Sequence, residues 1–159
     1  MFLKPDYNLD SIYDIDIKEL KSAGIKALFF DLDSTLMKSK SGKFSFRTAQ
    51  FLQDLKLNFK LAIITNNKNI KYIKQVKSQT DVPVYHCAKK PNISVLMKAC
   101  RDFNLNSNDV AMIGDRPLSD ILGGINAGMT TILVDSISKD EENFIVRFAR
   151  FLERLTIKK

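Results

Sequence analysis

Short runs of consecutive apolar residues recur along the chain and alternate with longer segments whose apolar residues have helical spacing. The runs predict five strands, because ALFF and LAII are apolar at successive positions, as expected for strands buried on both faces. These predicted strands cover residues 25–30, 60–64, 82–85, 109–113 and 131–134. The segments between them predict helices over residues 46–58, 69–78, 93–103 and 118–127.

This alternation of strand and helix predicts an α/β fold with a mostly parallel five-stranded sheet and helices on both of its faces. Gly128 is expected to cap the C-terminus of a helix. Residues 1–24 are expected to form a lead-in that packs on the core, with a helix from about Asp16. Residues 25–159 are then expected to form a single domain that ends in a basic amphipathic helix.

Composition excludes several classes of protein. The chain is 45% hydrophobic and 27% charged, which is typical of globular proteins and argues against disorder or a membrane bundle. It has no apolar segment that predicts a signal peptide or a spanning helix, so a cytoplasmic location is expected. Cys87 and Cys100 fit no metal-binding spacing and are expected to be buried free thiols.

The net charge of +7 is unevenly distributed along the chain. Residues 38–77 carry ten basic side chains and one acidic side chain, and residues 144–159 carry five and one. Such clustering favours an anionic partner, which could be a phosphate ester, an anionic bilayer or nucleic acid. A solvated lysine-rich face is the alternative.

Polar side chains follow four of the predicted strands at the points where these strands end. Ligands of open α/β sheets bind beyond the carboxyl ends of the strands, so these side chains are expected to share one site. They are Asp31, Asp33 and Thr35 after the first strand, Thr65, Asn66 and Asn67 after the second, Lys89 and Lys90 after the third, and Asp115 after the fourth.

Carboxylates crowded into one crevice repel each other, and a divalent cation relieves this repulsion. Mg²⁺ prefers oxygen ligands, so carboxylates, a backbone carbonyl and a phosphate oxygen could complete its coordination. A lysine, together with backbone amides near Thr65 and Asn66, could stabilise charge on phosphoryl oxygens. The sequence therefore predicts a Mg²⁺ site beside a phosphate site.

The segments DLDST, IITNN, KP and GDRPLSD, in this order, resemble the four motifs of the haloacid-dehalogenase (HAD) superfamily of phosphatases. The resemblance covers nearly the whole chain and implies a three-layer α/β/α fold. It also implies that Asp31 attacks phosphorus to give an aspartyl-phosphate. Asp33 would protonate the leaving group and then activate water.

The same resemblance implies which residues hold phosphate and metal. The phosphate-binding residues would be Thr65, Asn66 and Lys90, and the Mg²⁺ ligands would be Asp31, the backbone carbonyl of Asp33, and Asp115, with Asp120 in support. Lys90 is preferred to Lys89 because it directly precedes Pro91, and Lys89 stays the alternative. A helix cap at Thr65 and a helix-dipole role for Asp120 are the structural alternatives.

The spacing of these motifs leaves no room for a cap domain. Only 31 residues separate Asp33 from Thr65, and 24 separate Thr65 from Lys90. The site is therefore expected to be open and to suit a phosphate on a lipid, protein, nucleic acid or glycan. The stretches GIKALFFDLDSTL and GDRPLSDILGGINAGM resemble the capless YqeG family, related to mitochondrial phosphatidylglycerophosphate phosphatase, which implies a phospholipid head group as substrate.

Two alternatives to the lipid phosphatase stay open. The first is a phosphatase that acts on phosphoproteins or on nucleic-acid ends. The second is a non-catalytic basic protein with the same fold that binds nucleic acid. The second predicts a broken motif set, whereas every acid is present. No obligate protein partner is expected.

The C-terminal segment 142–159 predicts an amphipathic helix with one apolar face flanked by arginines. That face contains Phe144, Phe148, Phe151, Leu152 and Leu155. Packing of this helix on the sheet is the preferred interpretation. Peripheral contact with an anionic membrane, at its cytoplasmic face, is the alternative.

Overall fold

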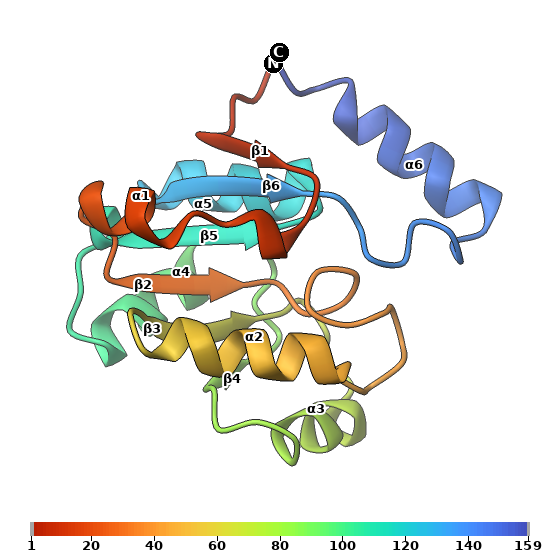
Figure 1. The fold of residues 1–159 in the computed structure, drawn as a ribbon. Helices are drawn as coiled ribbons and strands as arrows, with labels where there is room; N and C mark the ends of the chain where they lie inside the picture. Colours follow the sequence, from red (N-terminus) through yellow and green to blue (C-terminus); the bar gives the residue numbers. More distant parts are fainter. Residues whose placement is uncertain (1, 159) are drawn as a thin grey trace.

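The computed structural model describes residues 2–158, in which a parallel sheet lies between two layers of helices (Figure 1). The strands follow the order β1-β6-β5-β2-β3-β4, and each neighbouring pair is parallel. Their bounds are β1 (Tyr7–Leu9), β2 (Ala27–Phe30), β3 (Lys60–Ile64), β4 (Val84–Tyr85), β5 (Val110–Gly114) and β6 (Thr130–Val134). The predicted α/β class is thus confirmed.

The sheet has six strands within the described residues, one more than predicted, because β1 comes from the lead-in. Its sequence, Tyr-Asn-Leu, contains no apolar run, so hydrophobic pattern alone could not identify it. Side-chain hydrogen bonds support this edge strand. The carboxylate of Asp6 accepts hydrogen bonds from the Thr131 amide at 2.8 Å and from the Thr131 hydroxyl at 3.0 Å.

Side chains of the central strand β2 alternate between the two faces of the sheet, and each face carries its own core. Leu28 and Phe30 join the core on one face, with Leu52 of α2. Ala27 and Phe29 join the core on the other face, with Leu96 of α4. All four residues of β2 are fully buried, as the run ALFF predicted.

Helices cover both faces close to the predicted positions. Asp16 caps α1, in agreement with the predicted helix start, and Gly128 ends α5 in the left-handed conformation that favours glycine. The helices are η1 (Ile12–Asp14), α1 (Ile17–Ser22), α2 (Phe46–Lys56), α3 (Ile70–Lys77), α4 (Ser94–Asp102), η2 (Ser107–Asp109), the π-helix η3 (Pro117–Ile121), α5 (Leu122–Ala127) and α6 (Phe144–Arg154).

The order of the strands creates a switch point at β2. From β2 the chain continues to β3 and β4 on one side, and it later returns to β5 and β6 on the other. The loops after β2 and β5 therefore diverge from neighbouring strand ends, which is where doubly wound sheets bind ligands. In the described chain, the segments between the first three motifs form only α2 with β3 and α3 with β4, so no cap domain is inserted.

The C-terminal helix α6 departs from the preferred prediction that it packs on the sheet. None of its residues is buried, and Figure 1 shows it standing away from the sheet, beside the end of β6 to which the strand arrows point. Its C-terminal end is tied to the N-terminal segment, because Leu3 donates its amide to Thr156 at 2.6 Å and accepts from Lys158 at 2.8 Å.

Two further observations concern membrane spans and thiols. Among the described residues, no helix combines the length and the apolar character needed to cross a bilayer. Cys100 is buried as predicted, whereas Cys87 is exposed, so the prediction of two buried thiols was wrong for Cys87. Cys87 lies in the loop that follows the edge strand β4.

Two adjacent glycines of α5 allow a test of this packing. A methyl group on Gly124 would lie 2.7 Å from Cγ2 of the buried Thr131, whereas one on Gly123 would meet its nearest neighbour at 3.4 Å. We expect Gly124→Ala to lower the free energy of unfolding by about 1–3 kcal/mol through overpacking. Gly123→Ala should leave it unchanged or raise it by up to about 1 kcal/mol through helix propensity. Urea unfolding of both variants checks this order, and equal effects would contradict it.

Candidate active site

The segment that follows β2 folds into a compact turn. The carbonyl of Leu32 accepts hydrogen bonds from the amides of Thr35 and Leu36, at 3.2 and 2.9 Å. Ser34 adopts a left-handed conformation with φ of 68°, and its amide donates to the Met37 carbonyl. The turn directs the Thr35 hydroxyl to Asp115 Oδ1, at 2.8 Å, and places it 3.5 Å from Asp31 Oδ2.

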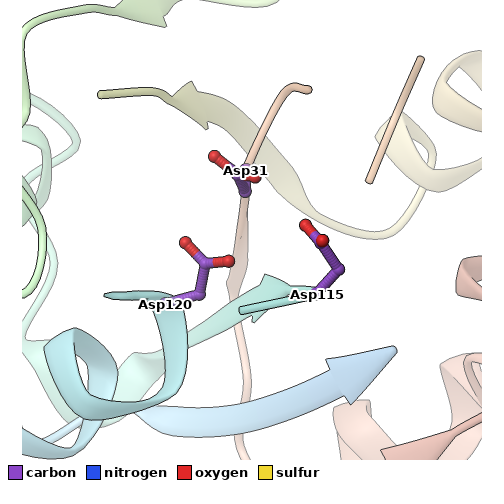
Figure 2. A group of neighbouring side chains, drawn as sticks. All are labelled: Asp31, Asp115 and Asp120. Carbon is purple, nitrogen blue, oxygen red and sulfur yellow. The ribbon is translucent and has the colours of Figure 1, made fainter. Parts of the chain in front are cut away.

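Three carboxylates from separate elements converge beside this turn. Figure 2 shows Asp31 beyond β2, Asp115 beyond β5 and Asp120 on η3, and each offers an oxygen within 4.8 Å of the others. Desolvation raises the pKa of both Asp115 and Asp120 above the usual range, and repulsion from Asp31 adds to the rise. The cluster therefore favours any cation that offsets this repulsion.

Gly114 makes the approach of Asp120 possible. A Cβ at this position would lie 2.1 Å from Asp120 Oδ2, so a side chain there would displace the carboxylate. Asp120 Oδ2 also accepts the Arg116 amide at 3.1 Å. Asp120 lies in a five-residue π-helix rather than in the regular helix predicted over residues 118–127. A glycine at the strand end and a π-helical turn thus place this carboxylate in the cluster.

Lys90 reaches the cluster from the loop after β4. Its side chain is only 1% exposed, and the ammonium donates to Asp31 Oδ1 at 2.8 Å, Asp120 Oδ1 at 2.7 Å and the Ile64 carbonyl at 2.7 Å. Burial by itself would lower the pKa of Lys90, but the carboxylates of Asp120 and Asp31 outweigh it and raise the pKa. All three N–H groups of the ammonium are thus used, and the side chain is fixed.

The backbone of Lys90 is held by Asn66. Asn66 Oδ1 accepts the Lys90 amide at 2.7 Å, and its side-chain amide donates to the Lys90 carbonyl at 3.0 Å. Lys89, the alternative in the sequence, is exposed, whereas Lys90 enters the cluster. The Asn66 side chain therefore positions the lysine loop.

Thr65 is buried at the end of β3, and its hydroxyl accepts the amide of Asn67 at 3.1 Å. This hydrogen bond closes a tight turn between β3 and α3. The N-cap of α3 is Asn69, so Thr65 does not cap that helix. Thr65 and Asn66 both line the same cavity as Asp31. The structure thus brings the predicted phosphate-binding residues to the predicted edge of the sheet.

Asp33 has a partner that the sequence did not indicate. The hydroxyl of Tyr72, on α3, donates to Asp33 Oδ1 at 2.5 Å, and Asn67 Nδ2 lies 3.4 Å from Oδ2. Desolvation and the contact with Asp33 raise the pKa of Tyr72, which keeps the phenol protonated as a donor. No sequence signal distinguished Tyr72 from an ordinary aromatic residue of an amphipathic helix.

Asp115 also has an unpredicted partner, Arg150 of α6. The guanidinium forms an ion pair with Asp115 Oδ2 and donates to Glu142 Oε1 and Oε2 at 2.9 and 2.8 Å. Glu153, one turn further along α6, pairs with Arg116. Because Arg150 lies 35 residues from Asp115 in the sequence, its spacing gave no signal for this contact.

Several of these groups line a cavity of about 480 Å³, whereas Tyr72 and Asp115 do not line it. Its wall combines catalytic candidates from the strand ends with side chains of α6. The lining residues are Asp31, Asp33, Ser34, Ser39, Thr65, Asn66, Asn67, Lys90, Arg116, Leu118, Ser119, Asp120, Arg150 and Glu153. The helix α6 therefore forms one side of the site, in a chain that has no cap within its described residues.

The donor set fits a hard divalent cation. Asp31, Asp115 and Asp120 supply only oxygen atoms, which Mg²⁺ prefers, and a carboxylate that already accepts a hydrogen bond has further lone pairs to offer. Burial is the main cause that raises the pKa of Asp115 and Asp120, and repulsion from Asp31 adds to the rise; a bound cation would reduce that repulsion. We conclude that these residues are able to hold Mg²⁺.

Comparisons with known proteins agree with this geometry. The Hydrolase-like family, described as HAD-hydrolase-like, matches residues 87–150. The chain is 32% identical over 154 residues to the probable phosphatase YqeG of Bacillus subtilis, a match that covers 96% of this chain and 88% of that protein. It is 29% identical to phosphatidylglycerophosphate phosphatase 1 of Arabidopsis thaliana, over 99% of this chain and 48% of that protein.

Among solved structures, the fold resembles that of the D,D-heptose 1.7-bisphosphate phosphatase from B. bronchiseptica complexed with magnesium and phosphate. The TM-score is 0.60 with 13% sequence identity, over 70% of this chain and 82% of that chain. This likeness concerns the fold alone, whereas the match to YqeG extends over most of both proteins. The chain therefore belongs to the HAD superfamily of phosphatases, and within it to the YqeG type.

Proposed function

We propose that this phosphatase is a Mg²⁺-dependent phosphomonoesterase that acts through an aspartyl-phosphate and converts phosphatidylglycerophosphate to phosphatidylglycerol. One observation supports the chemistry above all others. Asp31 lies at the wall of an open cavity with one oxygen held by the buried ammonium of Lys90, while Asp33 lines the same cavity. The two carboxylates proposed for attack and for proton transfer therefore line one cavity, and the ammonium of Lys90 orients the first of them.

In the proposed reaction, a carboxylate oxygen of Asp31 forms a bond to phosphorus while the bond from phosphorus to the ester oxygen breaks. Asp33 gives its proton to the departing alcohol oxygen. Asp33 then removes a proton from water, whose oxygen attacks phosphorus and releases inorganic phosphate and free Asp31. Tyr72, which donates to Asp33 Oδ1, holds that carboxyl group in place for both proton transfers.

Phosphate binding in this proposal falls to Thr65, the backbone near Asn66, and Lys90. Asp31, the backbone carbonyl of Asp33, and Asp115 would hold Mg²⁺, with Asp120 in support. When bound, Mg²⁺ would neutralise negative charge on the phosphoryl oxygens and on the carboxylate cluster. Lys90 keeps Asp31 oriented, because its ammonium is itself fixed by Asp120 and the Ile64 carbonyl.

The lipid substrate is supported by the open site and by the relatives. No inserted domain closes over the cavity in the described chain, so a phosphate at the end of an anchored molecule can enter. The Arabidopsis relative is named a phosphatidylglycerophosphate phosphatase, although this chain spans 48% of its length. A cytoplasmic location with peripheral contact at an anionic membrane is part of the same proposal.

Phosphate release from three substrates tests this function. We expect Mg²⁺-dependent release from phosphatidylglycerophosphate to exceed release from a phosphopeptide and from a 3′-phosphorylated oligonucleotide. Asp31→Asn should lower kcat by at least about a thousandfold, because the amide is a poor nucleophile. EDTA should abolish release by the wild type.

The panel also separates the alternatives. Preference for the phosphopeptide or the oligonucleotide would overturn the lipid substrate and leave the chemistry intact. Activity that is insensitive to Asp31→Asn would overturn the mechanism itself.

Replacement of Tyr72 tests the positioning of Asp33. Tyr72→Phe removes a hydrogen bond to a carboxylate, so kcat should fall roughly tenfold with little change in KM. Tyr85→Phe is the matched control, because the Tyr85 hydroxyl donates to Asp102, which does not line the cavity. Steady-state kinetics on a soluble phosphomonoester measures kcat and KM for both variants. Equal effects of the two variants would contradict the role of Tyr72.

Replacement of Arg150 tests whether its guanidinium and Mg²⁺ neutralise the same carboxylate. Arg150→Gln leaves Asp115 without its buried cationic partner, so Tm in EDTA should fall by roughly 5–10 °C. Mg²⁺ should recover most of this loss, because the metal would then offset the charge of Asp115. Arg147→Gln, which changes an exposed arginine of the same helix, is the control. An equal loss of Tm with and without Mg²⁺ would argue against a metal at Asp115.

A further inference from the structure

The helix α6 presents a continuous apolar face to solvent. Phe144, Phe148, Phe151 and Leu155 recur at helical spacing and therefore share one side of the helix. Phe144 is 80% exposed and Phe148 is 51% exposed. The rings stack along the helix, with centroids 6.2 Å apart for Phe144 and Phe148 and 6.5 Å apart for Phe148 and Phe151. Exposed aromatic faces of this kind mark an interaction surface.

The opposite side of α6 is fastened to the active site. Arg150 pairs with Asp115, and Glu153 pairs with Arg116, so both side chains point to the cavity that they line. Arg154 donates to the Val134 carbonyl at 3.0 Å and pairs with Asp135 at 2.7 Å. These contacts fix the orientation of the helix and leave its apolar face exposed to solvent. Figure 1 shows the helix itself standing away from the sheet.

Exposed cations lie on α6 itself and on loops at the same edge of the sheet, while Asp140 and Glu141 are exposed in the loop before the helix. Arg147 is exposed on α6, and Lys158 is exposed just beyond it. Exposed lysines also occupy the loops after β2, β3 and β4, at the edge of the sheet that holds the cavity, and they are Lys40, Lys43, Lys68 and Lys89. Apolar aromatic side chains next to arginine and lysine are the combination with which a helix binds the surface of an anionic bilayer.

We propose that the apolar face of α6 inserts into the head-group region of an anionic bilayer and thereby places the open cavity at the membrane surface. This inference builds on the lipid substrate proposed above, since a bilayer is where such a substrate resides. Charge favours a bilayer over a second copy of this chain. A symmetric contact between two α6 faces would bring their flanking cations together.

Co-sedimentation with vesicles tests the docking surface without turnover. The wild type should bind vesicles that contain phosphatidylglycerol more strongly than vesicles of phosphatidylcholine alone. The double variant Phe144→Ser/Phe148→Ser should lower the partition constant at least about tenfold, because two aromatic side chains no longer leave water. Leu57→Ser is the matched control, since Leu57 is 85% exposed and caps the C-terminus of α2, which lies near the amino-terminal end of β3 and away from the cavity.

Circular dichroism and Tm establish that all variants remain folded, as expected for substitutions of exposed side chains. Failure of the wild type to bind, or equal binding by the double variant, overturns the docking surface. Dimerisation of the wild type without vesicles, abolished by the double variant, also overturns it in favour of a second copy. Vesicle binding by a chain that releases no phosphate from phosphatidylglycerophosphate supports the docking surface and overturns the proposed function alone.

Discussion

The buried ammonium of Lys90 is the interaction on which the arrangement of the site depends. A buried unpaired ammonium is unfavourable by several kcal/mol, and it is tolerated only with good hydrogen-bond geometry and opposite charge nearby. Asp31, Asp120 and the Ile64 carbonyl supply three acceptors at 2.7–2.8 Å. These acceptors come from three different strand ends or turns. The ammonium therefore fixes the positions of β2, β3 and η3 relative to one another at the carboxyl edge of the sheet.

The order of the strands makes this convergence possible. Because β2 lies between β3 and β5 in a parallel sheet, the segments that follow all three strands emerge at one edge. The lysine comes from the loop after β4 and reaches the cluster because Asn66 holds its backbone against the end of β3. Gly114 leaves the space that Asp120 occupies. The ammonium of Lys90 thus joins Asp31 and Asp120, whereas Asp115 has its own cation in Arg150.

The helix α6 forms one side of the site, in a chain that has no cap domain within its described residues. Its polar side pairs with Asp115 and Arg116, and its apolar side faces solvent. A cap domain would shield a small substrate from water, whereas this helix closes one side only and leaves the cavity open. An amphipathic pattern usually predicts that the apolar side of a helix packs on the core. In α6 the polar side makes the contacts with the rest of the protein instead, so the pattern was misleading.

The sequence by itself determined the fold class. It also predicted that the acids and the adjacent lysines Lys89 and Lys90 follow strands at one edge of the sheet. Buried strands and the polar residues that follow them are local patterns, and parallel topology converts them into a common edge. Tertiary structure decided the contacts between segments distant in sequence. Tyr72 reaches Asp33 across 39 residues and Arg150 reaches Asp115 across 35.

The sequence favoured Lys90 over Lys89 only because Pro91 follows it, and the structure confirms this preference. The reason lies in the tertiary structure, because which of two adjacent side chains enters the core depends on the backbone of the loop that carries them. For a related reason the edge strand β1 was missed, and the exposed face of α6 was only the alternative to packing on the sheet. A three-residue strand and an amphipathic helix each acquire a definite orientation only from what they pack against. Their neighbours, β6 for the strand and the acidic cluster with Arg116 for the helix, exist only once the chain has folded.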